Sequence, residues 1–222
     1  MAEPEHDGLF REIDEELRQE HYAKLWKRYG TYIIAAAVAL VVVVAGYQGW
    51  RTYDIDQRET ASARFGAALR IAATDAEGAG LEFAALAEEG GGGYALMARF
   101  QQAGLLARSG DWAGAIAIYE RIAADADDPL FRDLAVLLGA IHEINAPMAG
   151  LDAASLEARL APLREEANPW RYSARELTAL LALRDGDTER ARAVFEEIAN
   201  DPSAPAALRS RAAELLSATG SG

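Results

Sequence analysis

The three histidines are the first residues to test for chemistry, because imidazole is a common metal ligand and general base. His6, His21 and His142 lie far apart, and no two of them have the spacing of a metal-ligand pair. The chain also contains no cysteine. Zinc sites in proteins usually combine clustered histidine and cysteine side chains. The sequence therefore predicts no metal site.

One acidic stretch imitates a calcium-binding loop. Asp185, Asp187, Glu189 and Glu196 match positions 1, 3, 5 and 12 of such a loop. The sixth position, which requires glycine for a sharp turn, is occupied by Arg190. We therefore interpret these carboxylates as a solvated turn that caps a helix.

Other catalytic patterns are missing from the sequence. The pairs Glu165-Glu166 and Glu196-Glu197 are adjacent, so their side chains diverge around a helix. No G-x-S-x-G motif is present. The glycine run at residues 90–93 has no phosphate-binding lysine, because residues 51–222 contain no lysine. We expect no catalytic residue, no cofactor and no small-molecule substrate, and therefore no enzyme.

The first structural element that the sequence predicts is a membrane helix. Residues 29–50 read YGTYIIAAAVALVVVVAGYQGW and contain no charged side chain. As a helix they would be about 33 Å long, enough to cross a hydrocarbon layer of about 30 Å. Aromatic side chains, which are typical of membrane interfaces, flank both ends of this stretch: Trp26, Tyr29 and Tyr32 at one end, and Tyr47, Trp50 and Tyr53 at the other.

The charges beside this helix predict its orientation. Lys24, Lys27 and Arg28 immediately precede it, and basic residues favour the cytoplasmic side. We therefore expect residues 1–28 to form a cytoplasmic tail and residues 51–222 to lie across the membrane. The wider flanks are nearly balanced, with five basic residues before the helix and four after it. A cleavable signal peptide is the competing interpretation, but the charged leader and the apolar run are both long for one.

The charge balance excludes one class of partner. The net charge is −13, of which −10 belongs to residues 51–222, where 17 arginines face 27 acidic residues. Such a surface repels phosphate backbones, so we expect no nucleic-acid partner. The same 172 residues are enough for one domain with its own core.

The sequence after the membrane helix is typical of helices, so the predicted fold class is all-α. Alanine, leucine, arginine and glutamate dominate it, and glycine or proline marks the breaks. Two helical hairpins, each with a Gly-Asp turn, are the clearest elements: residues 95–108 and 112–124 around Gly110-Asp111, and residues 170–184 and 188–199 around Gly186-Asp187.

Small and aromatic residues recur at equal distances from the two turns. Small residues let helices approach closely and an aromatic ring fills the remaining gap, which is the packing of a tetratricopeptide hairpin with a period of about 34 residues. The predicted repeat-packing residues are Ala103 and Ala179 seven residues before the turn glycine, Ala115 and Ala191 five after it, and Tyr119 and Phe195 nine after it. The domain is thus expected to be a solenoid of tetratricopeptide-like hairpins.

The two turns are 76 residues apart, about two periods, so one degenerate repeat is expected between them. Its helices would occupy residues 130–144 and 153–166. A helix at residues 205–216 would close the array. Before the first hairpin we expect a short helix at residues 81–87 and an outward continuation of the membrane helix through residues 52–73. A generic helical bundle with chance spacing is the alternative.

Several short motifs match one known family: Lys27-Arg28-Tyr29-Gly30 entering the membrane, Gly49-Trp50-Arg51 with Tyr53 leaving it, Gly93-Tyr94-Ala95, and Gly110-Asp111 with Ala115. In these features, and over most of its length, the chain resembles the YfgM-like family of ancillary SecYEG translocon subunits. The resemblance implies a single-pass protein of the bacterial inner membrane with a periplasmic tetratricopeptide-like domain at residues 51–222. It also implies the SecYEG translocon and a periplasmic chaperone as partners.

The expected function is that of a membrane-anchored protein-binding module, because tethering raises the effective concentration of the repeats near a partner. The resemblance implies an accessory subunit of the Sec translocon that assists a periplasmic chaperone network. An envelope scaffold for cell division or wall synthesis is the alternative. Five residues on the inner faces of the hairpins are candidate partner contacts: Met97, Phe100, Arg108, Glu176 and Arg184. Met97 and Phe100 are alternatively core residues.

Overall fold

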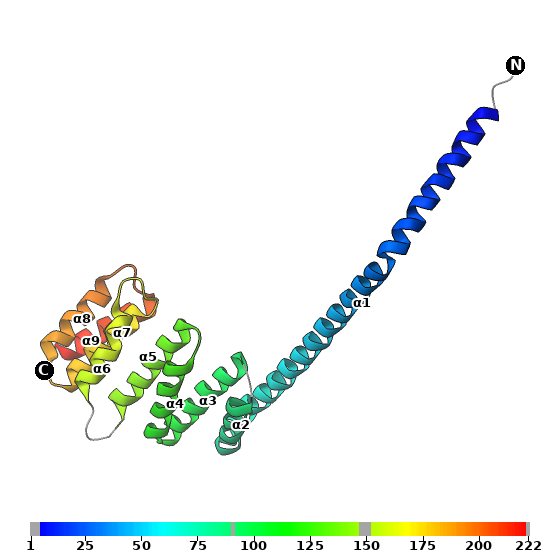
Figure 1. Cartoon of the computed structure of the whole chain (residues 1–222). Coiled ribbons are helices and arrows are strands. Elements are labelled where there is room, and N and C mark those ends of the chain that lie inside the picture. The colour runs from blue at the N-terminus through cyan, green and yellow to red at the C-terminus, as the bar shows by residue number, and fades with distance from the viewer. Residues whose placement is uncertain (1–4, 90–91, 147–151, 221–222) are drawn as a thin grey trace. The chain divides into compact units, whose positions relative to one another are not determined.

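The structure, a computed structural model, describes residues 5–89, 92–146 and 152–220, with side chains described from residue 24 onward. Within these residues the chain forms α-helices and one short 3-10 helix, and no β-strand (Figure 1). The all-α prediction is confirmed. The chain divides into two compact units, residues 1–59 and 60–222, and each is described by itself.

The first unit is formed by helix α1, which spans Glu5–Ile71 and continues into the second unit. The part from Lys24 to Ile71 is long and apolar enough to cross a membrane, so it is a candidate membrane span. The helix continues beyond the apolar run, as expected. It passes residues 28 and 50 without a break, so the boundaries between tail, membrane helix and domain stay predictions.

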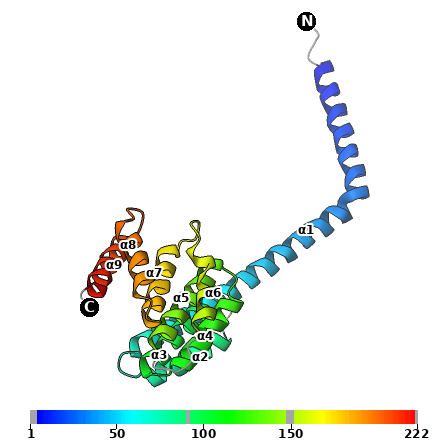
Figure 2. The ribbon, with the colours of Figure 1, turned by 90° about the vertical axis from the view of Figure 1, so that its left-hand side faces the viewer.

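The second unit is a chain of short helices, most of which pack against the next one in sequence. Figures 1 and 2 both show this succession up to the neighbouring α8 and α9. After α1 the elements are α2 (Ala76–Glu89), α3 (Gly93–Ser109), α4 (Trp112–Asp125), α5 (Pro129–Asn145), α6 (Ala153–Leu160), the 3-10 helix η1 (Pro162–Arg164), α7 (Arg171–Arg184), α8 (Thr188–Asn200) and α9 (Ala206–Thr219).

Two predicted helices differ in length from the observed ones. The expected helix at residues 153–166 is wrong in extent, because α6 ends at Leu160 and η1 follows it. Pro162 has no N–H to donate to the helical ladder, which ends the α-helix here. Helix α2 is longer than the predicted residues 81–87, because Asp75 caps it by accepting from the Gly78 N–H at 2.8 Å. The other predicted helices agree within a few residues.

The two Gly-Asp turns have the same backbone geometry. Gly110 and Gly186 have φ of 88° and 83°, a left-handed conformation that glycine adopts without a Cβ penalty. The following aspartates, Asp111 and Asp187, each accept a hydrogen bond from the N–H three residues later, at 2.9 and 3.1 Å. One residue therefore ends a helix and the next begins another, which produces a tight hairpin.

The core consists of four small clusters rather than one large one. Buried Phe83 lies between the end of α1, α2 and α3, and buried Tyr119 lies between α3, α4 and α5. Leu160 and Phe195 belong to the two later clusters. A series of local cores is typical of repeat proteins, in which each hairpin contacts mainly its neighbours.

Candidate protein-binding surface

The predicted repeat-packing residues lie in two clusters, one for each Gly-Asp hairpin. Ala103, Ala115 and Tyr119 are buried together where α3, α4 and α5 meet. The other cluster, at α7, α8 and α9, contains Ala179, Ala191 and Phe195. The structure therefore brings together the residues of each hairpin, and no predicted packing residue is exposed.

The repeat extends further than the sequence analysis recognised. Asp75, Asp111, Asp152 and Asp187 begin α2, α4, α6 and α8, and each accepts a hydrogen bond from the N–H three residues later. They are 36, 41 and 35 residues apart. A capping aspartate satisfies a backbone donor at the start of each helix. The same local signal thus starts four helices at roughly regular intervals.

Three buried positions recur after each capping aspartate. Four residues after it stand Ala79, Ala115, Leu156 and Ala191; eight after it, Phe83, Tyr119, Leu160 and Phe195; eleven after it, Leu86, Ile122, Leu163 and Ile198. The prediction missed the copy in α2, because its turn contains no glycine. The pattern of Asp75, Ala79 and Phe83 was the signal that could have found it.

The candidate contacts on α3 differ in exposure. Phe100 is half-buried, and its ring centroid lies 6.2 Å from that of Tyr119 and 6.4 Å from that of Phe131. Met97 is half-buried, and Arg108 is exposed. Phe100 therefore contributes to the packing between α3, α4 and α5, whereas Arg108 is accessible to a partner.

The candidate contacts on α7 both have partners within the fold. Glu176 is only 6% exposed and accepts two hydrogen bonds from Arg211 on α9, one of them, from Nη2, at 2.5 Å. This bond raises the pKa of Arg211. Arg184 donates to the backbone carbonyl of Glu143 at 2.9 Å and to that of Ile144, at the end of α5. Both side chains join neighbouring helices, and a role in partner binding stays a prediction for them.

The second unit has a hollow of about 380 Å³ between α4, α5 and α6. Ala123 on α4 and Ala135, Val136 and Gly139 on α5 form its apolar floor. A Cβ at Gly139 would lie 3.4 Å from the Cβ of Tyr119, so glycine at this position lets α5 lie close to α4. No sequence prediction included this hollow.

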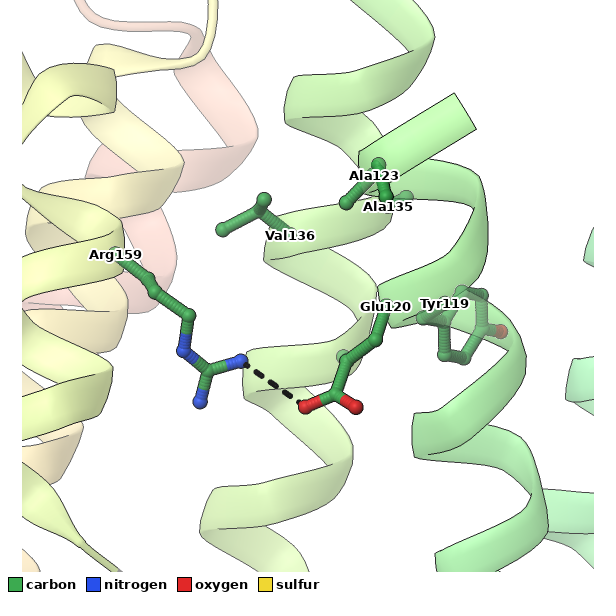
Figure 3. Close-up of a pocket in the computed structure, with 8 residues that line it drawn as sticks. Tyr119, Glu120, Ala123, Ala135, Val136 and Arg159 are labelled. Carbon is green, nitrogen blue, oxygen red and sulfur yellow. Dashed lines mark ion pairs between the residues drawn. The ribbon is translucent and has the colours of Figure 1, made fainter. Parts of the chain in front are cut away.

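Charged side chains stand at the edge of the hollow. Figure 3 shows Arg159 of α6 pointing toward Glu120 of α4, with 3.9 Å between Nη1 and Oε1. Arg159 also pairs with Glu143 of α5, at 2.5 Å between Nη2 and Oε2. The bond to Glu143 is the main cause of the raised pKa of Arg159, and Glu120 and Asp152 add to it. The guanidinium is therefore held mainly by Glu143.

Tyr119, which lines the hollow, also belongs to an aromatic stack. The rings of His142 and Tyr119 are parallel within 11°, with 5.5 Å between their centroids. The ring of Trp112 also lies against His142, with 5.7 Å between the two centroids. Burial lowers the pKa of His142 and raises that of Tyr119. His142 therefore favours its neutral form more than a free imidazole does. Among the described residues no group of three or more His, Asp or Glu side chains could hold a metal ion.

Comparison with known proteins identifies the repeat. A family profile described as a tetratricopeptide repeat-like domain matches residues 23–211. No curated protein and no solved structure matches the chain significantly. The matched region includes the candidate membrane span as well as all four capping aspartates.

Proposed function

Because the chain belongs to the tetratricopeptide repeat-like domain family, whose repeat arrays serve as protein-interaction scaffolds, we propose that it is a protein-binding module anchored in a membrane by α1. Its repeats would bind a protein partner, and its anchor would keep them beside that partner. A fold of this kind is typically a non-catalytic scaffold, and the hollow and hairpin surfaces described above contain no arrangement that suggests a reaction.

The observation that carries the proposal is the exposure of the apolar part of α1. Val41, Val42, Val43 and Val44 are 66, 65, 67 and 50% exposed. Four consecutive residues point around the whole circumference of a helix, because each is turned by about 100° from the last. A helix on the surface of a soluble domain is apolar on one face only. A helix that is apolar on every side requires an apolar surrounding, which a bilayer provides.

The finer assignment rests on the likeness to the YfgM-like family and on the basic residues before the span. We place residues 1–28 in the cytoplasm, residues 29–50 in the bacterial inner membrane and residues 51–222 in the periplasm. The proposed partners are the SecYEG translocon and a periplasmic chaperone. Tethering confines the repeats to a thin layer beside these partners, so that weak contacts become occupied.

The membrane assignment is tested first with the full chain. Alkaline carbonate should leave the protein in the membrane fraction, and a reporter fused after Gly222 should behave as periplasmic. Release by carbonate would contradict the anchor. Cytoplasmic reporter activity would reverse the orientation, and a mature protein that starts near Gly46 would replace the anchor with a signal peptide.

The partner assignment is tested by purification from mild detergent at matched expression. Translocon and chaperone subunits should dominate the recovered proteins. Division or wall-synthesis proteins in their place would favour the envelope scaffold. Replacing residues 29–50 by an unrelated membrane helix should preserve recovery if the span is an anchor only, whereas loss would show that the span itself contacts the partner. Equal recovery with an untethered, folded domain would show that proximity is not the mechanism.

A further inference from the structure

The hollow between α4, α5 and α6 combines two features that the packing of the repeats does not require. Its floor of Ala123, Ala135, Val136 and Gly139 is apolar and about 380 Å³ is open above it. This volume lies in the range of small ligand pockets, about 300 to 1,000 Å³. The open volume can therefore take one side chain from another molecule.

Two carboxylates pair with the guanidinium at the edge of this hollow. Among the described residues that line it, Arg159 is the guanidinium and Glu120 the carboxylate, and Glu143, next to the lining, also pairs with Arg159. Glu143 holds it at 2.5 Å, and the second oxygen of Glu143, Oε1, is buried without a hydrogen-bond partner within the described residues. The local charge is negative, and it adds to the net acidity of the domain.

Glu120 is the carboxylate that an incoming group can reach. Its side chain is 61% exposed, and its contact with Arg159 is long, at 3.9 Å. Within the described part of the chain it makes no hydrogen bond. Its Oε1 lies at ion-pair distance from Arg159, whereas Oε2 has no partner within the described residues, so Oε2 is available as an acceptor at the mouth of the hollow.

We propose that the hollow receives a lysine side chain of the partner polypeptide, with the aliphatic stem on the apolar floor and the ammonium group at Glu120. Lysine has a flexible four-carbon stem and a compact charged head, and such side chains bury the stem while the head stays in water. An acidic side chain would be repelled by Glu120. A purely aliphatic side chain would cover the floor but leave Glu120 without a cation. The inference rests on the proposed function as a protein-binding module.

The test uses the full chain in lipid nanodiscs and three probes: the peptides acetyl-Ala-X-Ala-amide in which X is lysine, norleucine or glutamate. Binding is followed by the methyl NMR signals of Val136, Ala123 and Ala135. The lysine peptide should shift all three and should bind about three- to fivefold more tightly than the norleucine peptide, as expected for a partly exposed ion pair. The glutamate peptide should give no shift at these methyl groups.

A matched pair of variants assigns the charge effect. Glu120→Gln should weaken the lysine peptide about three- to fivefold and leave the norleucine peptide unchanged. Glu196→Gln, which removes the same charge from an exposed position on α8, should change neither. Raised salt should reduce the preference for lysine. Equal binding of lysine and norleucine, or equal effects of the two variants, would overturn the proposal.

Failure of this inference differs from failure of the proposed function. If the peptides do not bind while the full chain still recovers protein partners from membranes, the module stands and the hollow is not its lysine site. If the peptides bind as expected while no protein partner is recovered, the hollow is a cation site and the proposed function is wrong.

Discussion

The hairpins α3–α4 and α5–α6 share a capping aspartate and the same buried positions, but different side chains fill these positions. In the first, the position four residues after the capping aspartate is Ala115, and the ring of Tyr119 fills the space one turn later. In the second, Leu156 and Leu160 occupy these positions, and α6 ends directly after Leu160. The hairpin α7–α8 follows the first pattern, with Ala191 and Phe195.

The difference shows that a repeat can conserve its buried positions while it changes the side chains that fill them. A small residue lets two helices approach and an aromatic ring fills the gap, whereas two fully buried leucine side chains fill the same positions in α6. The short α6 leaves part of α4 and α5 uncovered, and the hollow lies there. Variation in the repeat thus creates the one described surface that we assign to a specific chemistry.

The largest effect is expected for Leu156→Ala. This side chain is fully buried in the cluster of α5, α6 and α7, and its loss should lower the free energy of unfolding by about 2–5 kcal/mol through lost burial and a cavity. Chemical denaturation of the full chain in detergent is the measurement. Leu81→Ala, at an exposed position, is the matched control and should change stability little. Equal effects would show that α6 does not belong to the repeat packing.

The reverse change at the same repeat position is expected to come next. Ala115→Leu and Ala191→Leu should each overpack a fully buried contact and cost about 1–3 kcal/mol. Ala193→Leu, on the exposed face of α8, makes the same substitution without a buried contact. Thermal unfolding compares the three variants. If all three were tolerated alike, the alignment of the hairpins with α6 would be incorrect.

A smaller effect is expected at the turn glycine of the Gly-Asp hairpins, which the hairpin α5–α6 lacks. Gly186→Ala places a Cβ on a residue with φ of 83°, which should cost about 1–2 kcal/mol. Gly104→Ala, inside α3, meets only the mobile end of Arg108 at 3.6 Å and should instead stabilise the helix by about 0.5–1 kcal/mol. Melting temperatures should therefore fall for Gly186→Ala and rise for Gly104→Ala. A fall in both would indicate a general sensitivity to glycine replacement rather than a requirement of the turn.

The smallest effect concerns His142, which packs α5 of the second hairpin against Tyr119 of the first. Burial lowers its pKa below the ordinary 6.5, so the folded protein binds a proton here less readily than the unfolded chain. The stability contributed by the neutral ring is full above pH 6.5 and is lost as the pH falls below that value. His142→Phe should show a smaller loss of melting temperature between pH 7.5 and pH 5.5. Because the carboxylates titrate in both proteins, parallel curves would show that His142 is not responsible.

Sequence reasoning predicted the helices well where a local signal marks both ends. Gly110-Asp111 is such a signal, because a left-handed glycine ends one helix and an aspartate side chain caps the next within four residues. It failed at Asp75, where the preceding turn contains no glycine, and at Leu160, where a proline two residues later ends the helix. Both missed features are also local, so a search for the cap and its buried followers would have found them.

The candidate site was harder to predict than the helices. Arg108 and Arg184 are both exposed arginines at the end of a first hairpin helix, but Arg184 binds the backbone carbonyls at the end of α5. Glu176 pairs with Arg211, which lies 35 residues later in the sequence. No periodicity within one helix can show which residue of a different helix will supply a partner.

The sequence by itself determined the apolar span, the all-helical character and the spacing of the repeats, because these follow from hydrophobicity, propensity and capping over short stretches of chain. Only the tertiary structure decided that Glu176 and Arg184 join neighbouring helices, that His142 stacks on Tyr119, and that a hollow opens beside Glu120. Each of these depends on the distance between helices. That distance is set by the volumes of side chains from several helices at once, which a linear pattern does not contain.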